Sequence, residues 1–196
     1  MKRKIVFATN NAHKLEEVAA ILGEEFEVLG LRAIGCTADI PETSDTFAGN
    51  ALQKAQYVKE HYGYDCFADD SGLEVDALDG APGVYSARYS GGGSEENMSK
   101  LLYNLTGKSE RGAQFRTVIA LLIGEEPRYF EGIVRGTIIG ERRGEGGFGY
   151  DPVFAPKEAG GLSFAQMTAE AKNAISHRGR ATKKFAEYLL KEETGK

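Results

Sequence analysis

The chain has 196 residues, of which 41% are hydrophobic and 27% are charged, so it suits one domain with a sizeable core. The formal net charge of −5 argues against general binding to nucleic acid, which requires a basic surface. No apolar stretch is long enough to span a membrane, and Cys36 and Cys66 lie too far apart for a zinc motif or a disulfide scaffold, so we expect a cytoplasmic protein.

The first predicted strand, Ile5–Ala8, is followed by polar residues and an amphipathic helix. Apolar residues at helical spacing run over Leu15–Leu22, and either Asn10 or Asn11 is suited to cap the helix. Lys14 lies in the first turn, where a cation is unfavourable unless an anion binds nearby. The sequence leaves two interpretations open, a phosphate-binding lysine and an exposed lysine that points away.

A second strand, Phe26–Leu29, leads through a loop that carries Glu42 into a longer helix. Apolar residues at helical spacing begin at position 48, and a glycine at position 63 ends the pattern. Asn50 and Lys54 are four residues apart, so they lie together along one rim of the apolar stripe. On most helices such a pair faces solvent, and the pair alone favours that interpretation.

The centre of the chain is an apolar run, Cys66–Ala68, that leads into two adjacent acids, Asp69 and Asp70. Two carboxylates at the end of a buried strand repel each other and lose water, unless a cation lies beside them. Mg²⁺ would satisfy them, because it combines one or two carboxylates with substrate phosphates. A turn that the two acids cap is an equally good interpretation. We expect Ser71-Gly72 to break the strand, after which Leu73–Val75 resumes a half-buried strand pattern.

The next segment holds turns and a helix. Pro82-Gly83 marks a tight turn, and Arg88 is a partner for the upstream acids, for a substrate phosphate, or for a structural ion pair. Ser94 is the predicted N-cap of a helix over Glu95–Leu105.

Two β-rich runs, Gln114–Ile123 and Arg128–Ile139, are joined by Gly-Glu-Glu-Pro, which is the strongest hairpin signal in the chain. The loop that follows contains a formal G-x-G-x-x-G match, but nearby prolines oppose the helix that a Rossmann motif needs. We expect this loop to present Phe148–Asp151 to a flat ligand. The alternative is a hairpin loop whose aromatic residues pack into the core.

The end of the chain is predicted to form two helices, a short one over Thr168–Ile175 and a longer one that begins at Ser176. His177 and Arg178 lie at the start of the second helix, with Lys172 nearby. Cations again gather at a helix N-terminus, and an anionic or carbonyl-bearing ligand would explain them.

These features together meet the requirements of a magnesium–nucleotide site. The cations are Lys14, Lys54 and Arg178, and the separate acids are Glu42, Asp69 and Asp70. No G-x-x-x-x-G-K-[ST] motif is present, which excludes a P-loop enzyme. No Cys/His/Ser triad suggests itself, which favours a metal-activated water as the nucleophile.

Six short motifs follow one another from the first strand to the last helix. They are Thr9-Asn10-Asn11-Ala12-His13-Lys14, Glu42-Thr43 with Asn50-Ala51 and Lys54-Ala55, Phe67-Ala68-Asp69-Asp70-Ser71-Gly72-Leu73, Pro82-Gly83-Val84-Tyr85-Ser86-Ala87-Arg88-Tyr89, Gly147-Phe148-Gly149-Tyr150-Asp151-Pro152 and Ser176-His177-Arg178-Gly179. The ordered set resembles the inosine/xanthosine triphosphate pyrophosphatase family over essentially the whole chain.

This resemblance implies an elongated α/β fold of two lobes around a long mixed β-sheet, with a central nucleotide cleft and residues 1–196 as one pyrophosphatase domain. It implies a house-cleaning hydrolase, usually a homodimer, that uses Mg²⁺. Such an enzyme converts ITP, dITP or XTP to the monophosphate and pyrophosphate.

The resemblance also assigns roles to residues. Thr9, Asn10, Asn11, Ala12, His13, Lys14 and Lys54 would hold the triphosphate. Glu42 and Asp70 would bind the metal, Asp70 would accept the proton of the attacking water, and Ser71 would contact the substrate. Phe148, Gly149, Tyr150, Asp151, Lys172, His177 and Arg178 would form the base pocket. Asp69 would be an outer ligand or a ligand of a second metal, and Gly49 stands where relatives often carry an acid.

The predicted pocket suggests a basis for selectivity. Donors from Lys172, His177 and Arg178 would pair with the 6-oxo group of hypoxanthine or xanthine, and adenine would leave them unpaired at a cost of ~1–3 kcal/mol each. Guanine shares the 6-oxo group, so its exclusion must act around C2, through a residue that the sequence does not identify. Two alternatives are a related pyrophosphatase acting on pyrimidine or modified nucleotides, and a nucleotide sensor without turnover.

Overall fold

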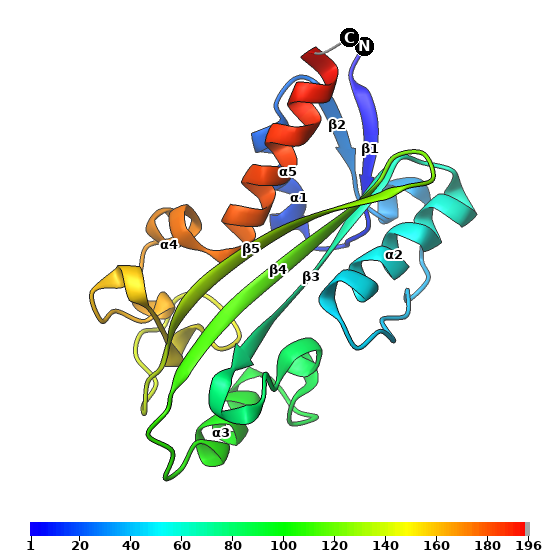
Figure 1. Cartoon of the computed structure of the whole chain (residues 1–196). Helices are drawn as coiled ribbons and strands as arrows, with labels where there is room; N and C mark the ends of the chain where they lie inside the picture. The colour runs from blue at the N-terminus through cyan, green and yellow to red at the C-terminus, as the bar shows by residue number, and fades with distance from the viewer. Residues whose placement is uncertain (195–196) are drawn as a thin grey trace. The chain divides into compact units, whose positions relative to one another are not determined.

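The computed structural model describes residues 1–194 and has a mixed α/β fold (Figure 1). Its strands and helices are β1 (Arg3–Phe7), α1 (Ala12–Leu22), β2 (Phe26–Leu29), α2 (Phe47–Tyr62), β3 (Cys66–Val75), α3 (Ser94–Asn104), β4 (Gly112–Leu122), β5 (Pro127–Ile138), β6 (Phe154–Pro156), α4 (Ala169–Ile175) and α5 (His177–Thr194). None of the helices in this part of the chain combines the length and apolarity needed to cross a bilayer.

The six strands form one sheet in the order β2-β1-β3-β4-β5-β6. β1 pairs in parallel with β2 and with β3, whereas β5 and β6 pair in antiparallel orientation. Parallel and antiparallel pairs in one sheet confirm the predicted mixed α/β class. β4 and β5 are neighbours joined by four residues, which confirms the predicted hairpin.

The chain forms two compact units, and three strands contribute residues to both. The first unit contains Met1–Asp70, Val118–Glu131 and the chain from Ala181, and the second contains Ser71–Thr117 and Gly132–Arg180. The chain passes from the first unit to the second within β3, between the predicted proton acceptor Asp70 and the predicted substrate contact Ser71.

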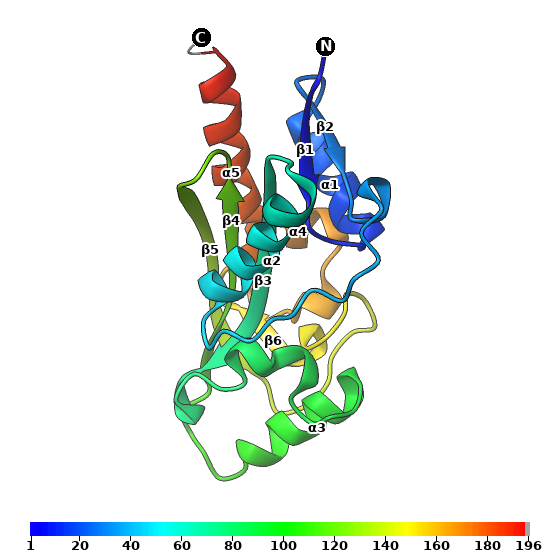
Figure 2. The same ribbon diagram turned by 90° about the vertical axis from the view of Figure 1, so that its right-hand side faces the viewer.

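In the first unit, alternation along β1 and β3 separates two hydrophobic clusters. Phe7 and Phe67 belong to a cluster that contains apolar residues of α1 and α5, whereas Val6 and Ala68 belong to a cluster with α2. Successive side chains of a strand point to opposite faces, so this part of the sheet is covered on both faces. Figure 2 shows α2 lying along β3.

The second unit has a separate core. It joins the end of β3, the first part of β4, the second part of β5 and helix α3 with the segment around β6. Its aromatic centre is Phe115, which lies 4.6 Å from Phe154 and 5.9 Å from Phe164 between ring centroids.

Two local predictions are wrong. Ser71-Gly72 does not break the strand, because β3 continues to Val75, Gly72 is buried and the Ser71 hydroxyl lies 2.8 Å from Thr117 Oγ1. Pairing with a neighbouring strand therefore overrides the local turn signal. Ser94 is the first residue of α3 and not its N-cap, since the backbone N–H of Gly93 donates to the Glu96 carboxylate.

Candidate functional site

The first predicted site segment forms the start of α1 in the first unit. The Asn11 side chain accepts a hydrogen bond from Lys14 N at 3.1 Å, so Asn11 is the N-cap, and Asn11 N donates to Thr9 Oγ1. Ala12 and His13 supply amide groups in the first turn, where helix donors have no intrahelical acceptor. Asn10 and His13 are exposed. The segment therefore presents backbone donors of the kind that bind phosphate.

Asp69 and Asp70 extend the alternation of β3 and make contacts with different helices. Asp69 is 4% exposed, and both of its carboxylate oxygens accept hydrogen bonds from Lys14 Nζ, at 2.9 and 3.0 Å. Lys14 therefore does not point away into solvent. Asp70 Oδ2 accepts a hydrogen bond from Asn50 Nδ2 of α2, at 3.1 Å. The prediction that the two acids only cap a turn is wrong, because both lie within a continuous strand.

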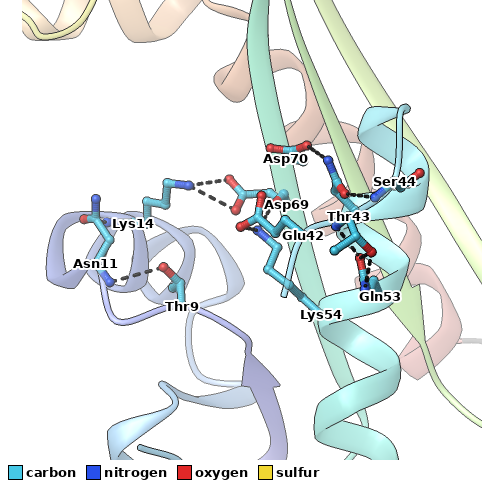
Figure 3. Close-up of polar contacts among 11 residues, drawn as sticks. Thr9, Asn11, Lys14, Glu42, Thr43, Ser44, Gln53, Lys54, Asp69 and Asp70 are labelled. Carbon is cyan, nitrogen blue, oxygen red and sulfur yellow. Dashed lines mark hydrogen bonds and ion pairs between the residues drawn. The ribbon is translucent and has the colours of Figure 1, made fainter. Parts of the chain in front are cut away.

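Helix α2 also holds the loop that carries Glu42. Lys54 Nζ lies 3.2 Å from Glu42 Oε1 and donates to the backbone oxygen of Asp69 at 2.6 Å. The next two loop residues donate through their backbone, Thr43 N to Gln53 Oε1 (Figure 3) and Ser44 N to Asn50 Oδ1. Residues 42, 43 and 44 thus pair in reverse order with residues 54, 53 and 50, all on one side of the helix.

Gly49 permits this close approach of loop and helix. A Cβ atom at position 49 would clash with the Ser44 hydroxyl and lie 2.7 Å from Ser44 Cβ. An acidic side chain at this position could not fit beside the loop as it is arranged here. Position 49 therefore contributes no carboxylate to the candidate metal site of this chain.

Two carboxylates of the first unit, Glu42 and Asp70, match the protein ligands that Mg²⁺ commonly takes. Glu42 and Asp70 contact Lys54 and Asn50, which are one turn apart on α2, so the two acids lie beside the same short stretch of helix. Within residues 1–194 there is no group of three or more His, Cys, Asp or Glu side chains that could hold a metal ion. Two carboxylates are what Mg²⁺ commonly takes from a protein when substrate phosphates complete its coordination.

A second set of predicted residues lines a cavity of about 290 Å³ in the second unit. The predicted residues on its wall are Ser71, Phe148, Gly149, Tyr150, Asp151, His177 and Arg178. The other residues on the wall are Gly72, Ser86, Ala87, Ser94, Asn97 and Phe115. Aromatic rings with a few polar groups are typical of a site for a flat ligand.

Asp151 organises the loop that carries Phe148. Its carboxylate is 3% exposed and accepts hydrogen bonds from Phe148 N at 3.0 Å and Lys172 Nζ at 2.5 Å. Gly147 has φ +69°, and a Cβ atom there would clash with Asp151. Lys172 Nζ also lies 4.5 Å from the centroid of the Phe148 ring. Among the described residues, Asp151 lines the cavity and Lys172 does not. Lys172 therefore supports the cavity wall through its contact with Asp151.

Rings and the start of α5 form another part of the cavity wall. The His177 ring stacks on Phe115 with 4.8 Å between centroids. Phe148 is 62% exposed, and Arg178 Cζ lies 5.6 Å from its centroid. Arg178 Nε is buried and makes no hydrogen bond to any residue within 1–194. Tyr150 of this loop packs into the core of the second unit, as the alternative interpretation expects, whereas Phe148 does not.

Tyr150 and Asn97 hold the part of the cavity wall that Ser86 and Ala87 form. Tyr150 Oη donates to Ser86 O at 2.7 Å, and Asn97 Nδ2 donates to Ala87 O at 3.1 Å. Burial raises the pKa of the Tyr150 hydroxyl, which keeps it protonated as a donor. Arg88, in the same segment, packs over the Tyr85 ring at 5.1 Å.

Sequence reasoning missed several of these residues. Asn97 and Phe115 line the cavity but lie in none of the six motifs, and Ser86 lies in a motif to which no role in the site is assigned. The spacing of Asn50 from Lys54 placed both residues on one rim of the helix, but that pattern alone favoured solvent exposure. In the structure Asn50 is only 1% exposed, so this prediction is wrong.

Comparison with known proteins gives a consistent result. The profile of the Ham1 family matches residues 5–188. A dITP/XTP pyrophosphatase from Porphyromonas gingivalis is 55% identical over 190 residues, which cover 95% of this chain and 97% of the relative. A protein of the same name from Flavobacterium psychrophilum is 50% identical over 188 residues, covering 95% of this chain and 98% of the relative.

Solved structures are also similar over nearly the whole chain. The Staphylococcus aureus Ham1 protein has a TM-score of 0.92 at 38% identity, covering 97% of this chain and 100% of that protein. A nucleoside-triphosphatase / dITP/XTP pyrophosphatase from Mycobacterium abscessus has a TM-score of 0.82 at 41% identity, covering 93% of this chain and 98% of that protein.

Proposed function

The chain belongs to the Ham1 family, and we propose that it hydrolyses deaminated purine nucleoside triphosphates (ITP, dITP and XTP) to the monophosphate and pyrophosphate. The family resemblance drawn from six sequence motifs is confirmed by these relatives. The observation that carries the proposed chemistry is that Glu42 and Asp70 contact Lys54 and Asn50, which are one turn apart on α2.

We assign Mg²⁺ to Glu42 and Asp70. When bound, the ion would neutralise phosphate charge and favour ionisation of the attacking water. Asp69 is not needed as a ligand in this scheme, because both of its carboxylate oxygens already accept hydrogen bonds from Lys14.

Asp70 is the proposed proton acceptor. A carboxylate in hydrogen-bond reach of the water can orient it and take up its proton as the bond between the α- and β-phosphates breaks. Asn50 Nδ2 donates a hydrogen bond to Asp70 Oδ2, and this bond restricts the directions that the carboxylate can take.

The triphosphate would bind at the start of α1 and beside α2. The amides of Ala12 and His13 offer donors, and Lys14 and Lys54 offer positive charge. Both lysines have acidic partners in the protein, Asp69 and Glu42, so each is held in place before the phosphates arrive. Such preorganisation lowers the entropy lost on binding.

The base would enter the cavity of the second unit beside Phe148. Arg178 lines that cavity, and its guanidinium carries N–H donors that a 6-oxo group can satisfy. An adenine amino group cannot accept this hydrogen bond, so the donor would stay unpaired at a cost of ~1–3 kcal/mol. Lys172 supports this wall through Asp151 and Phe148.

A panel of nucleoside triphosphates tests the proposal. With Mg²⁺ present, pyrophosphate release should be fast with ITP, dITP and XTP and at least about tenfold slower with ATP, as one unpaired donor predicts. Preference for pyrimidine or modified nucleotides would instead support the related pyrophosphatase. Tight binding of ITP without any release of pyrophosphate would support a sensor and contradict the enzyme.

Three properties expected from the sequence remain predictions: a homodimer, a cytoplasmic location and a central nucleotide cleft. Light scattering coupled to size-exclusion chromatography tests the first, and a monomer at assay concentration would contradict it.

A further inference from the structure

Asn50 is a fully buried polar residue with two hydrogen bonds of opposite direction. It is 1% exposed, its Oδ1 accepts from Ser44 N at 2.8 Å, and its Nδ2 donates to Asp70 Oδ2 at 3.1 Å. Burying a side-chain amide is costly unless both of its ends find partners. Here one end binds the backbone of the loop and the other binds the acid proposed as proton acceptor.

The chemistry of these partners fixes the orientation of the amide. A backbone N–H can only donate, so the Asn50 oxygen must face Ser44. The opposite rotation would set an NH₂ group against that N–H and an oxygen against the Asp70 carboxylate. The side chain therefore has one stable arrangement, with its donor directed at Asp70.

Asn50 also connects the two proposed metal ligands. Ser44 lies two residues after Glu42 in the loop, and Asp70 lies at the middle of β3. Asn50 is the first of the three α2 residues that bind this loop, and its amide nitrogen also donates to the Asp70 carboxylate. Its two bonds thus join the loop that carries one ligand to the other ligand.

We infer that Asn50 is a positioning residue for the hydrolysis, one that holds Asp70 in the direction required to bind the metal and accept a proton. This inference rests on the proposed function of Asp70. Outer residues that hold metal ligands typically change activity or metal affinity by roughly 10- to 100-fold when they are replaced.

Gln53 provides a matched control on the same helix. It binds the neighbouring loop residue, with Thr43 N donating to Gln53 Oε1 at 2.9 Å and Gln53 Nε2 donating to Thr43 Oγ1 at 3.0 Å. Loss of Gln53 therefore loosens the loop but leaves the hydrogen bond from Asn50 to Asp70 in place. The comparison separates anchoring of the loop from positioning of the acid.

The test measures steady-state kinetics with ITP and binding of Mn²⁺ alone, followed by electron paramagnetic resonance. Asn50→Leu should lower kcat and weaken Mn²⁺ binding by roughly 10- to 100-fold, with a change in KM of less than about threefold. Gln53→Leu should stay within about threefold of the wild type in all three quantities. Asn50→Asp, which keeps the acceptor for Ser44 but removes the donor to Asp70, should not recover kcat.

The outcomes separate the two proposals. If Asn50→Leu, folded by circular dichroism, keeps wild-type kcat and Mn²⁺ affinity, the positioning role is overturned. The same follows if Gln53→Leu loses as much as Asn50→Leu, or if Asn50→Asp, the variant closest in shape, is fully active. If the wild type releases no pyrophosphate, the proposed function fails, and the Mn²⁺ comparison alone still decides the role of Asn50. A wild type that also binds no Mn²⁺ overturns both.

Discussion

The two units organise their polar groups in different ways. In the first unit, each candidate cation already faces an acid, as in the pairs Lys14–Asp69 and Lys54–Glu42. In the second unit, the comparable ion pair, Lys172–Asp151, supports the wall of the cavity, and a buried Arg178 donor has no acceptor within residues 1–194. The first unit suits a ligand that brings much charge and a metal ion, whereas the second suits a neutral ring that brings one or two hydrogen-bond acceptors.

Removing the charge of Asp70 should have the greatest effect. Asp70→Asn keeps the shape of the side chain but cannot accept a proton, so kcat with ITP should fall by roughly 10²–10⁴-fold. Pyrophosphate release at saturating ITP and Mg²⁺ measures this. Asp39→Asn, an exposed acid in the same unit, should behave as the wild type. Near-normal turnover of Asp70→Asn would remove Asp70 from the mechanism.

A change in the second unit should act on binding and not on chemistry. Arg178→Ala removes the buried donor and one contact of Phe148, so KM for ITP should rise roughly tenfold while kcat changes much less. The preference for ITP over ATP should narrow by a similar factor. Arg88→Ala, which removes an exposed arginine packed on Tyr85, is the control. Unchanged kinetics in Arg178→Ala would exclude it from the base pocket.

Not every ion pair of the first unit belongs to the site, and Asp65 tests this distinction. Partial burial raises the pKa of Asp65, but hydrogen bonds from Arg3 and Lys59 outweigh it and hold the pKa below its usual value. A lowered pKa in the folded state adds stability above the unfolded value of about 3.9, and this is lost as the pH falls through the folded value.

Asp65→Asn should therefore destabilise the fold at pH 7 by no more than about 1 kcal/mol, because the three side chains are partly exposed. The difference in melting temperature from the wild type should shrink as the pH falls below about 4. Thermal melts at several pH values measure this, and kcat should not change. A difference that stays constant down to pH 2 would contradict the assigned cause.

Local patterns predicted most helices and strands because the spacing of apolar residues follows the period of each kind of element. Strand β2 was predicted with its observed bounds, and the hairpin of β4 and β5 followed from turn residues between two β-rich runs. The prediction that Ser71-Gly72 breaks the strand was wrong because it considered local residues alone. A strand inside a sheet is stabilised by neighbours that are distant in sequence, here Thr117 of β4.

The candidate site was predictable in its residue types but not in its pairings. Alternation places Asp69 and Asp70 on opposite faces of β3, but the sequence does not tell which helix covers each face. Topology decides that Lys14 of α1 meets Asp69 and Asn50 of α2 meets Asp70. Lys172 shows the same limit, since the family resemblance assigned it to the base pocket, whereas in the structure it contacts Asp151.

The missing side chain at Gly49 links two positions that are five residues apart. Since Ser44 fills the space that a Cβ atom would need, a larger residue at 49 must displace the loop that Asn50, Gln53 and Lys54 hold. Placing an acid at position 49 of this chain would therefore disturb the path of the loop that carries Glu42.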